Sequence, residues 1–373
     1  MRVSHHISSI FYLLSSIFYL TASAQDTLPP KKLFINFSGH YGFIAAHHKN
    51  MSYLIKRHVP AGELNFILQT NGEKHWEQVY KNPEKGVGIY FADLGNPQQL
   101  GQAIGFFSFI NFSLNPDRKF NLYFRSGNGI GIITKPYSRI NNHKNNVNGS
   151  FINAFVNLRL SSVFFPCRNL RLETGIGLTH LSNANWSLPN LGINIATINI
   201  GIGFKKSEIR SQKSEIRNQK SEEKQNPTYF FTLIAAVGVN QLSPGSEKKY
   251  ASYTIYASEW KTVSEKSRFC IGGDLFYEMA NIAASKRDTI FDTSNKLNNL
   301  QAGVRFGYEL VIGKIALPLE MGAYLFTKTT SNGLFYHRIG VRYYVNKHLI
   351  INYGIKTHWV VAENFEFGIG YRF

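Results

Sequence analysis

His180 and Ser182 lie two residues apart in the stretch "THLSNANWSLPNLGIN" (residues 179–194), which ends at Asn194. A histidine can take the proton of a serine hydroxyl, and the serine oxygen then attacks an ester carbonyl. An asparagine oxygen can accept from the other imidazole nitrogen and fix the tautomer of the ring. Asn183, or backbone amides of the following loop, would stabilise the oxyanion. The residue types suit acyl transfer, although a histidine and a serine this close are more often plain interfacial polar residues, since triads are recognised by geometry.

The three residues continue a pattern of period two that predicts strands. In the segment before the pair, the even-numbered residues Leu172, Ile176 and Leu178 are apolar, and the odd-numbered residues Glu173, Gly175, Gly177 and Thr179 suit a polar interior. In the next segment, Asn194 begins the apolar row Ala196, Ile198, Ile200, Ile202 and Phe204. We therefore expect the three side chains to point outward at one height on two adjacent strands. Polar groups that face lipid are costly unless they interact with one another or have a function.

The same alternation runs through the chain. Apolar rows such as Ala302, Val304, Phe306, Tyr308 and Leu310 alternate with Gly303, Arg305, Gly307 and Glu309. Many segments reach ten or more residues, the length needed to cross a bilayer at a tilt. Short turns, such as 313–314 and 346–348, alternate with long polar loops, such as 45–60, 135–147 and 281–298. This layout predicts an all-β, antiparallel outer-membrane barrel with about sixteen strands.

Both ends of the chain agree with export to that membrane. A basic start, the apolar run Ile10–Tyr19 and the triplet Ala22-Ser23-Ala24 predict a signal peptide over 1–24. Glu366, Gly368, Tyr371 and Phe373 fit the terminal signal that the barrel-assembly machinery recognises. The net charge of +18 indicates affinity for anionic lipid head groups rather than for nucleic acid. No metal cluster or cofactor fingerprint is present in the sequence, so no cofactor is expected.

A charged repeat, "KSEIRSQKSEIRNQKSEEKQN" at 206–226, interrupts the strand pattern. With one isoleucine per seven residues it lacks a coiled-coil seam and predicts a solvated insertion in a periplasmic turn. The predicted domains are 1–24, a catalytic barrel region at 25–204, the insertion at 205–227, and C-terminal barrel strands at 228–373. The strands could close one large barrel, or an eight-stranded barrel plus a second β unit.

His-x-Ser-Asn followed by Pro-Asn-x-Gly-Ile and a strand resembles the lipid A 3-O-deacylase family (the PagL type of the acyloxyacyl hydrolase group). The resemblance extends over about residues 33–204 and is sharpest at 172–204. It implies an outer-membrane barrel whose outward-facing site removes an ester-linked acyl chain from lipid A. By this match His180 is the base, Ser182 the nucleophile and Asn183 the neighbour assigned to the oxyanion site.

One position departs from the pattern of that family. The third residue of the family's triad is expected to be an acid twelve residues after the serine, and this chain has Asn194 there. An asparagine orients the histidine without stabilising imidazolium by charge. The sequence is also similar to the outer-membrane phospholipase A family, whose triad is Ser-His-Asn. Ala184 stands where that family usually has glycine, and this argues against it. The prediction is therefore a lipid A acyl-ester hydrolase, with a phospholipase A and a non-catalytic porin or structural barrel as alternatives.

Other residues give weaker signals. His47, His48 and Lys49 in the first long loop would contact lipid A phosphates, although a solvated loop is the default interpretation. Arg305, Arg338 and Arg342 should face the interior and pair with Glu309 and its neighbours. Cys167 and Cys270 either pair or simply pack, and the sequence does not decide between the two.

Overall fold

The structure is a computed structural model that describes residues 28–116, 120–209, 228–285, 294–328, 333–359 and 361–373. The predicted signal peptide at 1–24 and positions 210–226 of the charged repeat lie outside the described residues. Among the residues that it does describe, no helix combines the length and the hydropathy needed to cross a bilayer.

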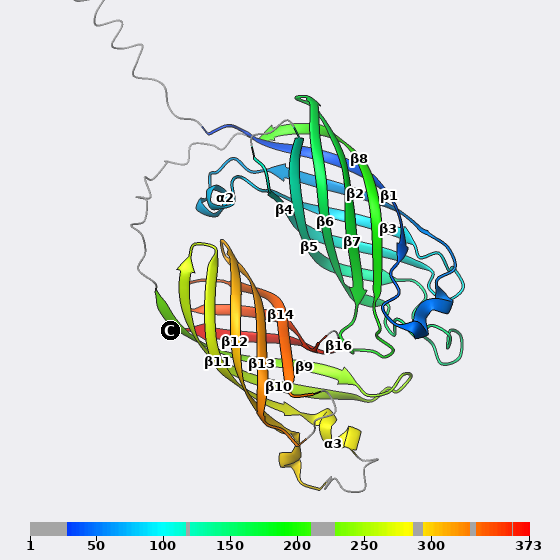
Figure 1. Cartoon of the computed structure of the whole chain (residues 1–373), viewed down its shortest axis with the longest axis vertical. Helices are drawn as coiled ribbons and strands as arrows, with labels where there is room; N and C mark the ends of the chain where they lie inside the picture. The colour runs from blue at the N-terminus through cyan, green and yellow to red at the C-terminus, as the bar shows by residue number, and fades with distance from the viewer. Residues whose placement is uncertain (1–27, 117–119, 210–227, 286–293, 329–332, 360) are drawn as a thin grey trace, which may run out of the picture.

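Sixteen strands in the described part of the chain form two closed antiparallel barrels of eight strands each (Figure 1). The first contains β1 (Lys31–Ile44), β2 (Val59–Gln69), β3 (Glu84–Asp93), β4 (Gln102–Ser113), β5 (Phe120–Ile133), β6 (Ile152–Cys167), β7 (Leu170–Ser182) and β8 (Ile193–Ile209). The second contains β9 (Tyr229–Gln241), β10 (Lys249–Ser264), β11 (Ser267–Glu278), β12 (Leu300–Ile312), β13 (Ile315–Phe326), β14 (Phe335–Tyr344), β15 (Leu349–His358) and β16 (Val361–Arg372). The predicted antiparallel barrel fold is confirmed. Of its two forms, the eight-stranded barrel with a second β unit is the one found.

Each barrel closes by pairing its last strand with its first. β8 pairs with β1 over fourteen residue pairs, and β16 pairs with β9. The β8 ladder reaches Ile209, so the strand continues into the first residues of the charged repeat. Closure leaves no unpaired strand edge, which a barrel in lipid requires.

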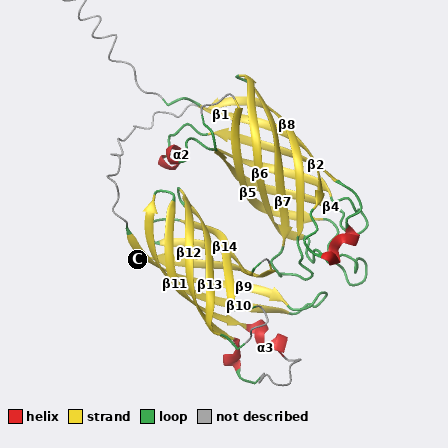
Figure 2. Cartoon of the chain, viewed as in Figure 1, coloured by secondary structure: helices red, strands yellow, loops and turns green. Residues whose placement is uncertain are grey.

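The connections differ between the two ends of the barrels (Figure 2). Two-residue turns join β10 to β11 and β12 to β13, while the opposite end carries 45–58, 134–151, 183–192 and 279–299. Short helical segments lie in some of the longer connections: Lys49–Leu54 (η1), Met279–Ser285 (α3) and Lys296–Asn299 (η2). One longer connection at the short-turn end, 70–83 with α2 (His75–Val79), was not singled out by the sequence pattern. At the long-loop end, β15 and β16 are separated by only two positions, 359–360. The other short turns and long loops named from the sequence lie at the ends where alternation places them.

The interior of the first barrel holds buried ion pairs toward the short-turn end and an apolar cluster toward the long loops. Glu63 accepts from Arg125 at 2.7 Å and from Arg159 at 2.5 Å, and Arg159 also reaches Glu173 at 3.3 Å. The apolar cluster includes Tyr90, Phe107, Phe155, Leu181 and Ile193. Because successive residues of a strand point to opposite sides, the same strands leave rows such as Ile198, Ile200 and Ile202 exposed on the outside.

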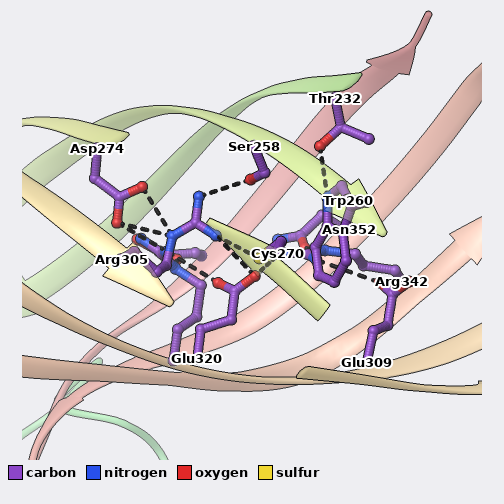
Figure 3. Close-up of polar contacts among 12 residues, drawn as sticks. Thr232, Ser258, Trp260, Cys270, Asp274, Arg305, Glu309, Glu320, Arg342 and Asn352 are labelled. Atoms are coloured by element: carbon purple, nitrogen blue, oxygen red, sulfur yellow. Dashed lines mark hydrogen bonds and ion pairs between the residues drawn. The ribbon is translucent and has the colours of Figure 1, made fainter. Parts of the chain in front are cut away.

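The interior of the second barrel is filled by a charge network (Figure 3). Arg305 lies between Asp274 and Glu320, 3.0 Å from each. Arg342 contacts Glu309 at 3.2 Å and Glu320 at 2.7 Å. Arg338 contacts the carboxylates of Glu366 at 2.5 Å, Asp274 at 3.3 Å and Glu320 at 3.2 Å. The three arginines therefore face inward and pair with carboxylates, as predicted, and their side chains occupy the lumen.

The two cysteines do not pair. Cys167 is exposed at the end of β6, and Cys270 is buried in β11. Cys270 packs with Phe230 and Trp260 inside the second barrel. Of the two possibilities left open by the sequence, packing is the one observed for Cys270.

Candidate active site

β7 and β8 place the three predicted residues together. His180 pairs directly with Asn194 across the antiparallel ladder, and such opposed residues have Cβ atoms about 5 Å apart. Ser182 lies two residues further along β7 and so shares the face of His180. Leu181 between them is completely buried in the apolar core of the barrel. Because this leucine points inward, its two neighbours point outward.

The three side chains form a continuous row of hydrogen bonds. His180 Nε2 lies 2.9 Å from Ser182 Oγ, and His180 Nδ1 lies 2.6 Å from Asn194 Oδ1. The amide oxygen can only accept, so Nδ1 carries the proton and Nε2 is free to accept from the serine hydroxyl. Ser182 is 8% exposed, and His180 and Asn194 are half-buried. This is the geometry of a nucleophile, a base and a residue that orients the base.

His47, from the connection between β1 and β2, extends the row on the far side of Asn194. Asn194 Nδ2 donates to His47 Nδ1 at 3.1 Å, and His47 Nε2 donates to the carbonyl oxygen of Leu191 at 2.7 Å. His47 Nδ1 also lies 3.4 Å from the carbonyl oxygen of Ala45. Since the Leu191 carbonyl needs a donor, the proton of a neutral His47 resides on Nε2 and its Nδ1 accepts. His47 therefore holds the amide of Asn194 with its oxygen toward His180.

The loop at 183–192 follows the serine and is tied together by asparagine side chains. The N–H of Asn183 donates to Asn190 Oδ1 at 2.9 Å. Asn183 Nδ2 donates to the carbonyl oxygen of Ser187 at 2.9 Å and to Asn148 Oδ1 at 3.3 Å. The donors of Asn183, the residue suggested for the oxyanion, are thus directed at protein acceptors. Asn183 shapes the loop in this structure.

Two backbone N–H groups of the same loop, unlike the donors of Asn183, are not directed at protein acceptors in the described part of the chain. The N–H groups of Ala184 and Asn185 make no hydrogen bond to any other residue that the structure describes. Both residues have a positive φ, 46° and 60°, a conformation that non-glycine residues adopt at a cost and that is frequent at functional sites. Ala184 is completely buried. A buried N–H group without an acceptor is rare in proteins and calls for an explanation.

Gly192 is the glycine of the Pro-Asn-x-Gly-Ile motif, and its surroundings explain why a larger residue does not fit there. Its φ is 78°, and a Cβ atom there would lie 3.0 Å from His180 Cε1 and 3.5 Å from the Cβ of Ser182. Its N–H donates to the carbonyl oxygen of Val147 at 3.0 Å. Glycine therefore lets the loop pass against the imidazole without displacing it.

Sequence reasoning anticipated some of these residues and missed others. It quoted Asn190 and Gly192 within a motif but assigned them no role. It grouped His47 with His48 and Lys49 as candidates for phosphate contacts, and only His47 reaches the site by a hydrogen bond that the structure records. His47 lies 147 residues from Asn194, so no local spacing could reveal the contact. The only signal of this contact in the sequence is that His47 is a polar residue just beyond the end of a strand.

Two family models match the chain. The family model described as lipid A 3-O-deacylase (PagL) matches residues 61–203, which include the three site residues of β7 and β8. The model described as the acyloxyacyl hydrolase C-terminal domain matches residues 229–373, the whole second barrel. No curated protein matches the chain.

Solved structures give only distant similarity. Neisserial surface protein A (NspA) is 7% identical, with 47% of this chain and 97% of that chain covered and a TM-score of 0.33. A triple mutant of the Rhodopseudomonas blastica porin is 7% identical, with 92% and 100% covered and a TM-score of 0.19.

The two family matches cover β7, most of β8 and the entire C-terminal barrel. Together with the closed barrels and their apolar outer rows, they point to the outer membrane. The chain belongs to the family of PagL-type lipid A deacylases and acyloxyacyl hydrolases.

Proposed function

We propose that this protein is an outer-membrane lipid A deacylase that hydrolyses an acyl ester with Ser182, His180 and Asn194. The observation that carries the proposal is the hydrogen-bonded row from Ser182 through His180 to Asn194 on the outer surface of a barrel. Family membership supports lipid A as the substrate. The site lies at the loop end of the lipid-facing surface, where an acyl ester in the outer leaflet can approach sideways.

In the first half of the reaction, His180 Nε2 takes the proton of Ser182 while Oγ forms a bond to the ester carbonyl carbon. The tetrahedral intermediate collapses when the ester C–O bond breaks. His180 then delivers the proton to the departing alcohol oxygen of lipid A. The products of this step are a lipid A alcohol and an acyl group on Ser182. Asn194 keeps the imidazole in the tautomer that both proton transfers require.

The negative charge on the carbonyl oxygen needs hydrogen-bond donors. We assign this role to the N–H groups of Ala184 and Asn185, the loop amides that sequence analysis gave as the alternative to Asn183. Their lack of a described protein acceptor supports the assignment. Donors held by the protein fold stabilise developing charge without reorganising during the reaction.

In the second half, water attacks the acyl carbonyl while His180 accepts a proton from it. The proton passes to Ser182 Oγ as the acyl bond breaks, and a fatty acid leaves. No step requires a cofactor. Recognition of the C-terminal Phe373 by the barrel-assembly machinery stays a prediction of the sequence.

The test is mass spectrometry of lipid A and phospholipids from cells that express the wild-type chain or Ser182→Ala. We expect wild-type cells to lose one acyl chain from lipid A and the variant cells to retain it. Lysophospholipid accumulating in place of deacylated lipid A would assign the protein to phospholipase activity. Identical lipid profiles from two folded proteins would refute catalysis and favour the non-catalytic barrel.

A further inference from the structure

The loop that follows the nucleophile contacts the second barrel. Gln241, the last residue of β9, donates its N–H to the carbonyl oxygen of Asn185 at 3.0 Å. Its Oε1 accepts from the N–H of Leu188 at 2.5 Å. Asn185 Nδ2 also donates to the carbonyl oxygen of Ala362 in β16, at 2.5 Å. These three bonds join a loop of the first barrel to two strands of the second.

A fourth contact involves the neighbouring strand of the second barrel. Lys249 pairs with Gln241 across the β9–β10 ladder, and its Nζ lies 4.0 Å from the ring centre of Trp186. A cation over an indole face is attracted by the ring quadrupole. The loop end of the β9–β10 hairpin therefore covers the loop from Asn185 to Leu188, and Figure 1 shows that loop next to the ends of β9 and β16.

Gln241 is suited to hold a fixed position. It is 5% exposed, and its Nε2 donates to the carbonyl oxygen of Ser246 in its own hairpin. That bond orients the amide so that Oε1 faces the loop. Buried polar groups with all partners satisfied fix one arrangement of the chain, whereas partly satisfied groups do not.

From these contacts we infer that the second barrel positions the catalytic loop of the first, with Gln241 as the principal positioning residue. The inference rests on the proposed function. The loop carries the N–H groups of Ala184 and Asn185, so its position decides how well they face the oxyanion. Charge on that oxygen develops mainly in the transition state, so loosening the loop should lower kcat and leave KM nearly unchanged.

The barrels also touch at the short-turn end, which provides a matched control. Tyr80 Oη donates to the carbonyl oxygen of Val311 at 2.7 Å. Burial raises the pKa of Tyr80 to about 12, so the hydroxyl keeps its proton. Tyr80→Phe removes one hydrogen bond between the same two barrels, at the end away from the loop. It should leave kcat and KM at wild-type values.

The experiment compares Gln241→Leu, Gln241→Glu and Tyr80→Phe in the full chain, with purified lipid A in detergent micelles as the substrate. We expect Gln241→Leu to lower kcat about tenfold with KM within about twofold of wild type. Gln241→Glu keeps an oxygen that accepts from Leu188 N–H but loses the donor to the Ser246 carbonyl, so its kcat should lie between those of wild type and Gln241→Leu. An unchanged kcat in Gln241→Leu, or an equal loss in Tyr80→Phe, would overturn the inference.

A second measurement does not depend on catalysis. Hydrogen–deuterium exchange of the peptide that covers 183–192 should become about tenfold faster in Gln241→Leu and stay unchanged in Tyr80→Phe. Unchanged exchange in Gln241→Leu would overturn the inference even if the enzyme is active. If exchange accelerates but wild-type protein cleaves no lipid A, the proposed function fails while the role of the second barrel in holding the loop stands.

Discussion

Asn194 stands where the resemblance to the lipid A 3-O-deacylase family implies an acid, and an amide at this position makes orientation critical. A carboxylate presents two equivalent oxygens to a histidine, but an amide presents an oxygen or an NH₂ group. The wrong orientation of Asn194 would direct a donor at His180 Nδ1 and stabilise the wrong tautomer. His47 prevents this by accepting from Asn194 Nδ2 at 3.1 Å. The chain therefore uses a fourth residue where an acid would need none.

This argument predicts a specific dependence between two positions. His47→Phe keeps a ring but removes the acceptor, so it should lower kcat about tenfold when Asn194 is present. In the Asn194→Asp background the same change should cost less than about twofold, because a carboxylate has no wrong orientation. Steady-state kinetics of the four proteins measures the difference. Equal losses in both backgrounds would show that His47 supports the loop without orienting the amide.

At the scale of elements, the site depends on how closely the loop approaches β7. Gly192 has a φ of 78°, and an added Cβ would lie 3.0 Å from the imidazole. Gly192→Ala should therefore displace His180 and lower kcat about tenfold or more, while the barrel stays folded.

The control for this change is Gly39→Ala. Gly39 lies in β1 on the outer face, and no atom comes within 4 Å of a Cβ built there. We expect wild-type kinetics from it. Both variants should keep the heat-dependent gel mobility of a folded barrel. Wild-type kcat in Gly192→Ala would contradict the role assigned to this glycine.

At the scale of the whole molecule, the buried charge network of the second barrel should dominate its stability. Arg338 neutralises Glu366, Asp274 and Glu320. Arg338→Ala leaves the buried Glu366 without its arginine, whereas Asp274 and Glu320 keep Arg305. Removing one partner of a buried ion pair costs about 3–5 kcal/mol. Urea unfolding of the refolded protein measures the change.

Arg57 gives the matched control, because its side chain is 62% exposed and its contact with Asp93 is 3.6 Å long. Arg57→Ala should change the free energy of unfolding by less than about 1 kcal/mol. A similar small change in Arg338→Ala would mean that the network is not a determinant of stability.

The same network predicts that the protein forms no channel. Arg305, Arg338 and Arg342 and their carboxylate partners occupy the lumen of the second barrel, and eight strands leave room only for side chains. Planar bilayers that contain the purified protein should show no conductance steps. Regular single-channel steps would favour a porin.

The sequence by itself determined every feature that depends on alternation. The alternation of apolar and polar residues with a period of two predicted the strands and their inward and outward faces. It also predicted the outward position of His180, Ser182 and Asn194. It also placed the interior arginines. These predictions need only the pleat, which sends successive side chains to opposite sides of any strand.

The tertiary structure decided what depends on pairing between distant segments. The alternation is the same in one sixteen-stranded barrel and in two eight-stranded barrels. Closure is settled by the long-range ladders of β8 with β1 and β16 with β9. The contact of His47 with Asn194 and of Gln241 with the catalytic loop likewise joins residues far apart in the chain. A local periodicity carries no information about such contacts, because they form only when the whole barrel closes and two barrels meet.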